Sequence, residues 1–151
     1  MVDESIPEQV RKLIGIKRIR QHRVNESEIV RFAQAIGETI SNSGGVLEAS
    51  LLFCQTLTYE EVPLELLPPD GSPKELDVPI PAARAVGGGS EYVVLRRVRA
   101  GETVTIESSL KDVYTKQGKS GMLYFVVVET RFDDAAGKPI ARETATFIKR
   151  V

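Results

Sequence analysis

Long strand patterns, separated by turn residues, dominate the second half of the chain, from Gly87 to Arg150. Thr103 to Tyr114 alternates apolar and polar residues, whereas Met122 to Phe132 is apolar at nearly every position. Alternation is typical of a strand with one face in water, and a continuous apolar run is typical of a strand covered on both faces. The pattern therefore predicts an antiparallel meander in which the run from Met122 is a central strand.

Two further runs complete this meander, Tyr92 to Val98 before it and Ile140 to Val151 after it. Gln117 to Gly121 and Asp133 to Gly137 supply the glycine and aspartate that favour tight turns between strands. A sheet of this kind needs a cover on its apolar faces. We expect a helix from the first half of the chain on one face, and a second subunit or a second copy of the domain on the other.

Two longer segments of the first half are predicted to be helical. Asn25 suits a helix N-cap, Glu28 completes a capping box, and Gly37 suits the end of the helix. The face between them carries apolar residues at helical spacing: Ile29, Phe32, Ala33 and Ile36. Val46 to Leu57 is apolar around most of the helix circumference, which is typical of a buried helix. The sequence therefore predicts an α+β fold of the hotdog type, a long antiparallel sheet wrapped around a buried central helix.

Two shorter elements precede these helices. Pro7 and Gly15 bracket residues 8–14 and predict one or two helical turns there. Ile16 to Val24 is rich in lysine and arginine and is predicted to be a short edge strand. Basic side chains on an edge strand discourage pairing with other sheets, so their charge favours a solvated edge over a binding patch.

Residues Tyr59 to Val86 lack periodicity and contain six of the eight prolines. Loops of this length in a compact domain are usually functional covers or disordered segments. Their apolar residues favour a cover that packs onto the domain: Leu64, Leu66, Leu67, Leu76, Val78 and Ile80. A length of 151 residues suits a single domain, which we expect to span residues 1–151 with 59–86 as its Pro-rich covering loop.

Charge and composition exclude several classes of protein. The formal net charge of −1, with acids and bases mixed, provides no basic field for nucleic acid. No signal-peptide core opens the chain, and no apolar run approaches the roughly 20 residues of a membrane span, so a soluble cytoplasmic protein is expected. The only cysteine, Cys54, follows Leu51–Phe53 and is expected to be a buried hydrophobe. Nothing in the sequence predicts a metal site or a cofactor.

Seven short motifs, in a consistent order and spacing, resemble the MaoC-like acyl dehydratases, the hotdog (R)-specific enoyl-CoA hydratases. They lie at residues 31–37, 44–46, 64–67, 87–92, 96–102, 112–114 and 126–130. The chain is most similar to the variant found as the N-terminal half of double-hotdog members or as a separate small subunit. The resemblance implies a lyase of the hydro-lyase class, an acyl-CoA or acyl-carrier-protein thioester as ligand, and a homodimer or a heterodimer with a second MaoC-like subunit.

The resemblance also implies a catalytic loop, and this chain departs from it. In the family an Asp and a His after the first helix activate water, and backbone N–H groups polarise the thioester carbonyl. The family pattern reads Phe-Ala-x-x-x-Gly-Asp-x-Asn-Pro-x-His. Here Glu38 occupies the Asp position, Ser43 stands near the His position, and the only histidine, His22, lies upstream. The residues that the resemblance places around the acyl thioester are Gly44, Gly45, Val46, Leu52 and Phe53.

Intact scaffold motifs beside the altered loop leave three hypotheses. The first is a non-catalytic acyl-binding subunit or half-domain, whose partner hotdog chain supplies the Asp and the His. The second is a divergent hydratase that acts alone through Glu38, with water or Asn42 in place of the missing group. The third is a non-catalytic homodimer that binds acyl-CoA or a carrier protein. Arg96, Arg97 and Arg99 either meet the phosphates of the ligand or are solvated strand residues.

Overall fold

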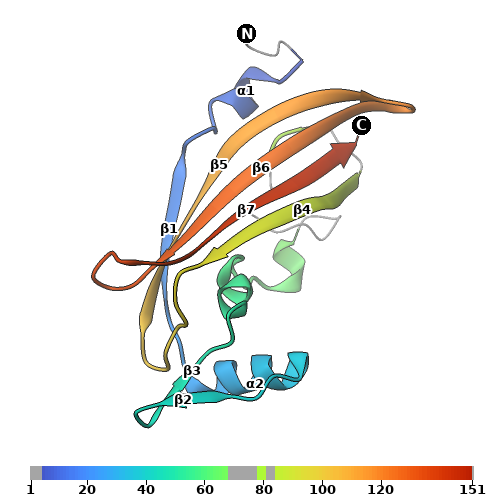
Figure 1. The fold of residues 1–151 in the computed structure, drawn as a ribbon. Helices are drawn as coiled ribbons and strands as arrows, with labels where there is room; N and C mark the ends of the chain where they lie inside the picture. Colours follow the sequence, from blue (N-terminus) through green and yellow to red (C-terminus); the bar gives the residue numbers. More distant parts are fainter. Residues whose placement is uncertain (1–4, 68–77, 81–83, 151) are drawn as a thin grey trace.

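Five antiparallel strands form one sheet in the order β1-β5-β6-β7-β4 in the computed structural model, which describes residues 5–67, 78–80 and 84–150 (Figure 1). The strands are β1 (Lys17–Arg23), β4 (Arg84–Val94), β5 (Thr103–Gly118), β6 (Gly121–Asp133) and β7 (Pro139–Arg150). The predicted meander is confirmed for β5, β6 and β7, with β6 at the centre of the sheet. The strand expected over Tyr92–Val98 is wrong in extent and in place: β4 begins eight residues earlier and ends at Val94, and it pairs with β7 rather than with β5, because the segment from Leu95 to Glu102 crosses to the far side of the sheet. The predicted edge strand is confirmed as β1, and β4 forms the opposite edge.

Register shifts occur at three places in the described sheet. They lie between Leu110 and Asp112 in β5, between Gly87 and Gly89 in β4, and at Phe132 and Asp133, where β6 pairs with β7. A Cβ atom at Gly88 would lie 3.0 Å from the Thr146 carbonyl oxygen, so the extra residue in β4 is accommodated best by glycine. Bulges bend strands and increase their twist. Figure 1 shows the long strands curving above the short helical segments drawn in green.

The first helix matches its prediction closely. α2 (Glu26–Ile36) begins after Asn25, whose Oδ1 accepts from the Glu28 backbone N–H, and Glu28 Oε2 accepts in return from the Asn25 N–H. Gly37 ends the helix with a φ of 70°. Ile29 and Ala33 are buried as expected, whereas the C-terminal Ile36 is exposed. The short α1 (Glu8–Arg11) confirms the helical turns expected there.

The central helix is shorter than the sequence predicts. Only Phe53–Leu57 are helical, as the 3-10 helix η1, while β3 (Val46–Glu48) pairs with β2 (Ser41–Ser43). The continuous helix expected over Val46–Leu57 is therefore wrong in extent, although the α+β hotdog class is confirmed. The physical reason is non-local: the backbone on either side of Glu48 bonds to the segment before β5, with Ala49 N to Val98 O at 2.8 Å and Ala100 N to Leu47 O at 2.9 Å.

The buried residues form two apolar clusters on one face of the sheet. The first joins η1 and α2 to the sheet through Phe53, Ile29 and Phe132, and the second contains Val10, Val126 and others. Between them a row of cross-strand neighbours carries polar side chains: Ser108, Thr130, Glu143 and Tyr92. The first three residues of this row are buried. A polar row therefore crosses the interior and separates the two clusters.

The central strand β6 is covered unequally on its two faces. Tyr124, Val126 and Val128 are buried, whereas their alternate neighbours Leu123 and Phe125 are half-buried. On the outer face the rings of Tyr114 and Phe125 stack with their centroids 4.8 Å apart. The inner cover predicted for this strand is confirmed, and the outer face of the single chain remains partly exposed.

The Pro-rich segment is described only in part. Val78 and Ile80 pack into the second apolar cluster, as expected of a cover. Leu64 and Leu66, in the 3-10 helix η2 (Leu64–Leu66), are instead 82% and 66% exposed. Leu76 lies outside the described residues. Within the described ranges, no helix is both long and apolar enough to cross a membrane.

Candidate functional site

Glu38 lies directly after the glycine that ends α2, with its side chain turned toward two partners. Arg97 Nη1 donates to Glu38 Oε1 at 3.2 Å. The pKa of the Glu38 carboxyl lies below its usual value, because hydrogen bonds from Ser50 and then from Arg97 favour the ionised form more than partial desolvation disfavours it. A carboxylate with a lowered pKa that already accepts two hydrogen bonds is a weak proton acceptor at neutral pH.

Arg97 also fixes the backbone near Glu38. The same Nη1 donates to the Ala49 carbonyl oxygen at 3.0 Å, and Ala49 is fully buried. One guanidinium therefore joins the end of α2 to the segment between β3 and η1. Sequence reasoning missed this role because Arg97 and Glu38 are 59 positions apart.

The loop that carries the catalytic pair in the family is a tight hairpin turn in this chain. Ser43 is exposed and pairs with Val46 across β2 and β3, and Gly44 and Gly45 between them have φ values of 61° and 84°. Asn42 Oδ1 accepts from the Gly45 N–H at 2.9 Å. Asn42 is therefore engaged in the turn, and Ser43 lies on the exposed side of the hairpin.

The residues expected around the acyl thioester do not all line one cavity. Gly45 and Val46 border a cavity of about 390 Å³ near the start of α2. Phe53 is buried and borders a different cavity of about 610 Å³. Leu52 is 47% exposed beside Leu51, which is 50% exposed. The residues expected around the acyl thioester therefore do not form one site: Phe53 is buried, Leu52 is exposed, and Gly44–Val46 lie in the hairpin turn.

His22 lies far from Glu38, at the other end of α2. Its Nε2 is 2.8 Å from Glu28 Oε1, in the first turn of the helix. A helix of 11 residues is about 16 Å long, so His22 and Glu38 do not form a pair. Among the residues that the structure describes, no group of three or more His, Cys, Asp or Glu side chains is placed to hold a metal ion.

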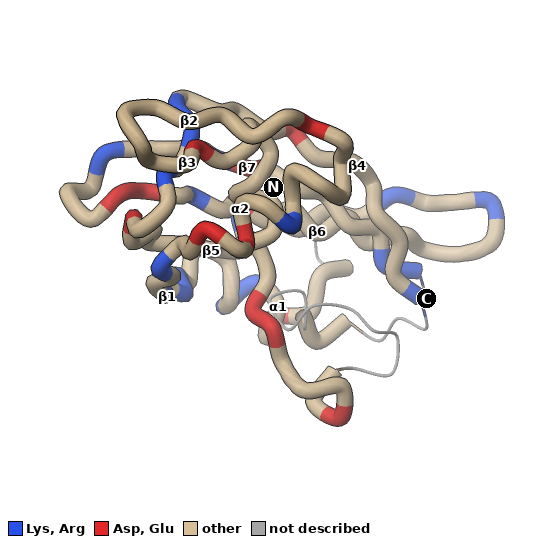
Figure 2. Tube along the Cα trace, turned by 90° about the horizontal axis from the view of Figure 1, so that it is seen from below, with Lys and Arg blue, Asp and Glu red and all other residues tan. Residues whose placement is uncertain are grey.

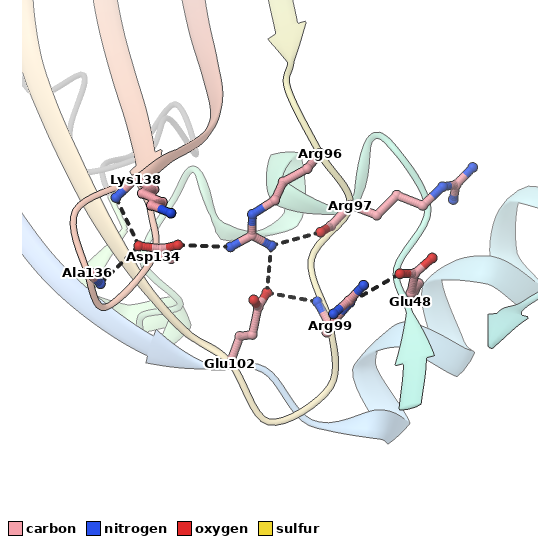
Figure 3. A network of polar contacts seen from close by, with 8 residues as sticks. All are labelled: Glu48, Arg96, Arg97, Arg99, Glu102, Asp134, Ala136 and Lys138. Atoms are coloured by element: carbon pink, nitrogen blue, oxygen red, sulfur yellow. Dashed lines mark hydrogen bonds and ion pairs between the residues drawn. The ribbon is translucent and has the colours of Figure 1, made fainter. Parts of the chain in front are cut away.

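The three arginines after β4 all form ion pairs, and Figure 3 shows those of Arg96 and Arg99. Arg96 bridges Glu102 at 3.1 Å and Asp134 at 3.3 Å, and Arg99 pairs with Glu48 at 3.2 Å. Backbone N–H groups of the β6–β7 turn are the main cause of the lowered pKa of Asp134. These contacts tie the connection between β4 and β5 to β3 and to the β6–β7 turn. They favour a structural role for the arginines over phosphate binding.

A buried polar group lies between η1 and the sheet. Thr58 Oγ1 donates to the buried Glu143 Oε2 at 2.8 Å. Burial raises the pKa of the nearby Cys54 thiol to about 11 and also raises the pKa of Tyr92. Cys54 is therefore a protonated, buried thiol at neutral pH, which supports its interpretation as a small hydrophobe.

One side of the molecule combines a free sheet edge with exposed apolar residues. β4 is the last strand of the described sheet and has one neighbour in it, β7. Val86 on this strand is 59% exposed, and η1 and η2, with the exposed Leu52 and Leu64 at or near them, lie below β4 in Figure 1. Acidic and basic residues are interspersed along the trace (Figure 2).

Comparisons with known proteins find a matching family model and solved structures of similar fold. A family model described as the FAS1-like dehydratase domain region matches residues 46–143. A MaoC-like dehydratase from Rhodospirillum rubrum has 19% identity and a TM-score of 0.59, covering 91% of this chain and 92% of its own. A chain of the ChsH1–ChsH2 complex from Mycobacterium tuberculosis has 20% identity and a TM-score of 0.68, covering 95% and 89%.

A third solved structure also comes from Mycobacterium tuberculosis. A chain of the C-terminally truncated HadBC complex, a (3R)-hydroxyacyl-ACP dehydratase, has 18% identity and a TM-score of 0.66, and covers 90% of this chain and 96% of its own. A comparison with curated proteins finds no match. At these identities the solved structures establish the fold, and they confirm the predicted hotdog architecture.

Proposed function

Because the chain belongs to the FAS1-like dehydratase domain family, as its resemblance to the MaoC-like dehydratases predicts, we propose that it is a non-catalytic acyl-binding hotdog subunit or half-domain. Its ligand is a 2-enoyl or 3-hydroxyacyl thioester of CoA or acyl carrier protein. A second MaoC-like hotdog chain supplies the Asp and the His that activate water. Residues 1–151 act as one domain, with 59–86 as its cover.

The state of Glu38 carries this proposal. A general base works best with a pKa near the working pH, whereas the Ser50 and Arg97 hydrogen bonds hold the pKa of Glu38 below its usual value. The only histidine pairs with Glu28 at the opposite end of α2. The chain therefore carries a neutralised ion pair at the position where the family has its base.

The β4 edge, which has no further strand beside it among the described residues, supports a partner. Unpaired strand edges readily accept another strand, and clustered exposed apolar residues mark interaction surfaces. β4 provides such an edge, with Val86 on it and Leu52 and Leu64 on segments below it. Two of the similar chains were solved in complexes, ChsH1–ChsH2 and HadBC, which favours a second hotdog chain as the partner.

In the proposed assembly this chain positions the ligand rather than transforming it. Leu52 and Val46 provide exposed apolar surface for the acyl group, whereas Phe53 is buried in the core of the domain. Gly44 and Gly45 let the backbone turn closely beside the thioester. The partner's acid and base add water across the double bond, with the hydroxyl group going to C3 and a proton to C2.

The test is the rate at which the purified chain removes the enoyl-thioester absorbance of a short 2-enoyl-CoA. We expect the chain alone, and its Glu38→Gln variant, to be no faster than buffer without protein. When a hotdog partner that contains the Asp-His pair is added, the mixture should be faster than this chain alone and faster than the partner alone. A dyad-containing hydratase active by itself is the positive control.

Turnover by the chain alone that disappears in Glu38→Gln would contradict the proposal and establish the divergent hydratase. Acyl-CoA binding by a homodimer, without turnover in the presence of any hotdog partner, would instead establish the binding-only module.

A further inference from the structure

The cavity of about 610 Å³ lies between β1, α2, η1 and the segment that follows η1. Small-molecule sites usually have volumes of about 300–1,000 Å³, so its size is that of a ligand site. Of the residues expected around the acyl thioester, it shares Phe53, while Glu38, Leu52 and the hairpin turn lie outside its lining. The proposed function therefore leaves this cavity without a role.

Apolar side chains line one part of the cavity. Phe32 and Phe53 meet edge to face, with their ring centroids 5.9 Å apart, and Leu57 lies beside them. Phe53 and Leu57 belong to the first apolar cluster and are held by the core behind them. Rigid apolar walls of this kind suit the hydrocarbon body of a ligand.

Cationic side chains from β1 and α2 border the same apolar surface. Arg20 donates one Nη2–H to the Leu57 carbonyl, and Arg31 donates its Nε–H to the Ser27 carbonyl at 3.3 Å. Each of these bonds uses one of the five N–H donors of a guanidinium. The remaining donors suit a carboxylate, which a guanidinium binds in a planar, two-pronged manner.

The acids of the cavity are arranged differently from the arginines. Both oxygens of Glu28 are engaged, Oε1 with His22 and Oε2 with the Asn25 N–H. Its charge therefore serves the helix cap and orients the imidazole. Glu60 and Glu61, by contrast, come from the segment after η1 and are exposed at the cavity. A ligand in the cavity thus meets the arginines of β1 and α2 on one side of its lining and the carboxylates of the segment after η1 on another.

We propose that this cavity binds an apolar carboxylic acid with a hydroxyl group at its far end. The carboxylate is held by Arg20 and Arg31, the hydrocarbon body lies on Phe32 and Phe53, and the hydroxyl donates to Glu61. This inference does not rest on the acyl-binding function, because the ligand is a free acid and its site is separate from Glu38.

The test uses amide NMR spectra of the full chain titrated with three probes: ω-hydroxydecanoate, decanoate and the corresponding diol. We expect saturable shifts centred on β1, α2 and η1, with the hydroxy acid binding most tightly and decanoate less tightly. The diol should bind about tenfold more weakly than the hydroxy acid, because it lacks the charged group that pairs with the arginines.

Two variants and a matched control localise the site. Arg31→Gln should weaken ω-hydroxydecanoate binding by about tenfold, because it removes a charge-assisted pair at an exposed position. Glu61→Ala should abolish the preference for the hydroxy acid over decanoate. Arg142→Gln removes another exposed arginine, from β7 and outside the lining, and should leave all three affinities unchanged.

Any of four results would overturn the proposal. Three concern affinity: unchanged affinity in Arg31→Gln, a diol that binds as tightly as the hydroxy acid, or no saturable shift with any probe. The fourth is a set of shifts centred on Leu51 and Leu52, because they would place the ligand at the acyl surface.

Discussion

Arg97 is the residue on which the interpretation of Glu38 depends. Its guanidinium contacts both the Glu38 carboxylate and the Ala49 carbonyl. The sequence identified Glu38 as the residue at the family's Asp position, but nothing local indicated that an arginine 59 positions away would neutralise it. The change of role at this site therefore comes from a tertiary contact.

Arg97→Met should raise the pKa of Glu38 toward its usual value, because one of the two hydrogen bonds that favour the ionised form is lost. The folded-state pKa of Glu38 is lowered, so ionisation stabilises the fold above the usual pKa, and this contribution disappears as the pH falls through the folded-state value. The stability difference between wild type and variant should therefore be largest near neutral pH and should shrink in acid.

NMR titration of the Glu38 side chain, with urea unfolding at several pH values, measures both effects. Arg99→Met, which removes the partner of Glu48 instead, is the control and should leave the Glu38 titration unchanged. If the pKa of Glu38 is the same in Arg97→Met as in the wild type, the hydrogen bond from Ser50 alone is what lowers it.

At the scale of elements, α2 and η1 show what local pattern predicts well and what it does not. α2 is specified by its cap, its apolar face and Gly37, all within a few residues of one another. η1 is preceded by Leu51 and Leu52, which match a helical apolar pattern but are exposed, while the residues before them pair with Val98 and Ala100. Non-local pairing of the backbone therefore ended a helix that the side chains alone would have favoured.

Asn25→Ala should lower the free energy of unfolding by about 1 kcal/mol, because the Glu28 N–H loses its side-chain acceptor at the start of α2. Urea unfolding measures the loss. Gln34→Ala, at an exposed position of the same helix, is the matched control and should leave stability unchanged or slightly higher. Equal losses in the two variants would contradict a capping role for Asn25.

At the scale of the whole molecule, the two edges of the sheet differ. β1 has basic residues throughout and joins β5, whereas β4 lies above η1 and η2, near which the exposed leucines lie. The sequence predicted the meander and the α+β hotdog class, because strand periodicity and turn residues are local. The arrangement of exposed apolar residues below one edge became visible only in the folded chain.

Val86→Glu should prevent co-elution of the chain with its hotdog partner in size-exclusion chromatography, since it places a charge on the β4 edge. Ile19→Glu is the matched control, because Ile19 is 63% exposed on the opposite edge strand and Val86 is 59% exposed. We expect Ile19→Glu to retain assembly and both variants to keep the wild-type circular dichroism spectrum. Loss of assembly in Ile19→Glu alone would move the interface to β1.

The sequence by itself determined β5, β6 and β7 of the meander, the capped helix α2, the buried state of Cys54 and the absence of the family's His after Gly37. These features depend on periodicity, caps and residue identity within short windows. Only the tertiary structure decided the length of η1, the ion pair of Glu38 with Arg97 and the cavity beside Phe53. The reason is that each of these depends on groups far apart in the chain, whose contact is set by the packing of the sheet against the first half.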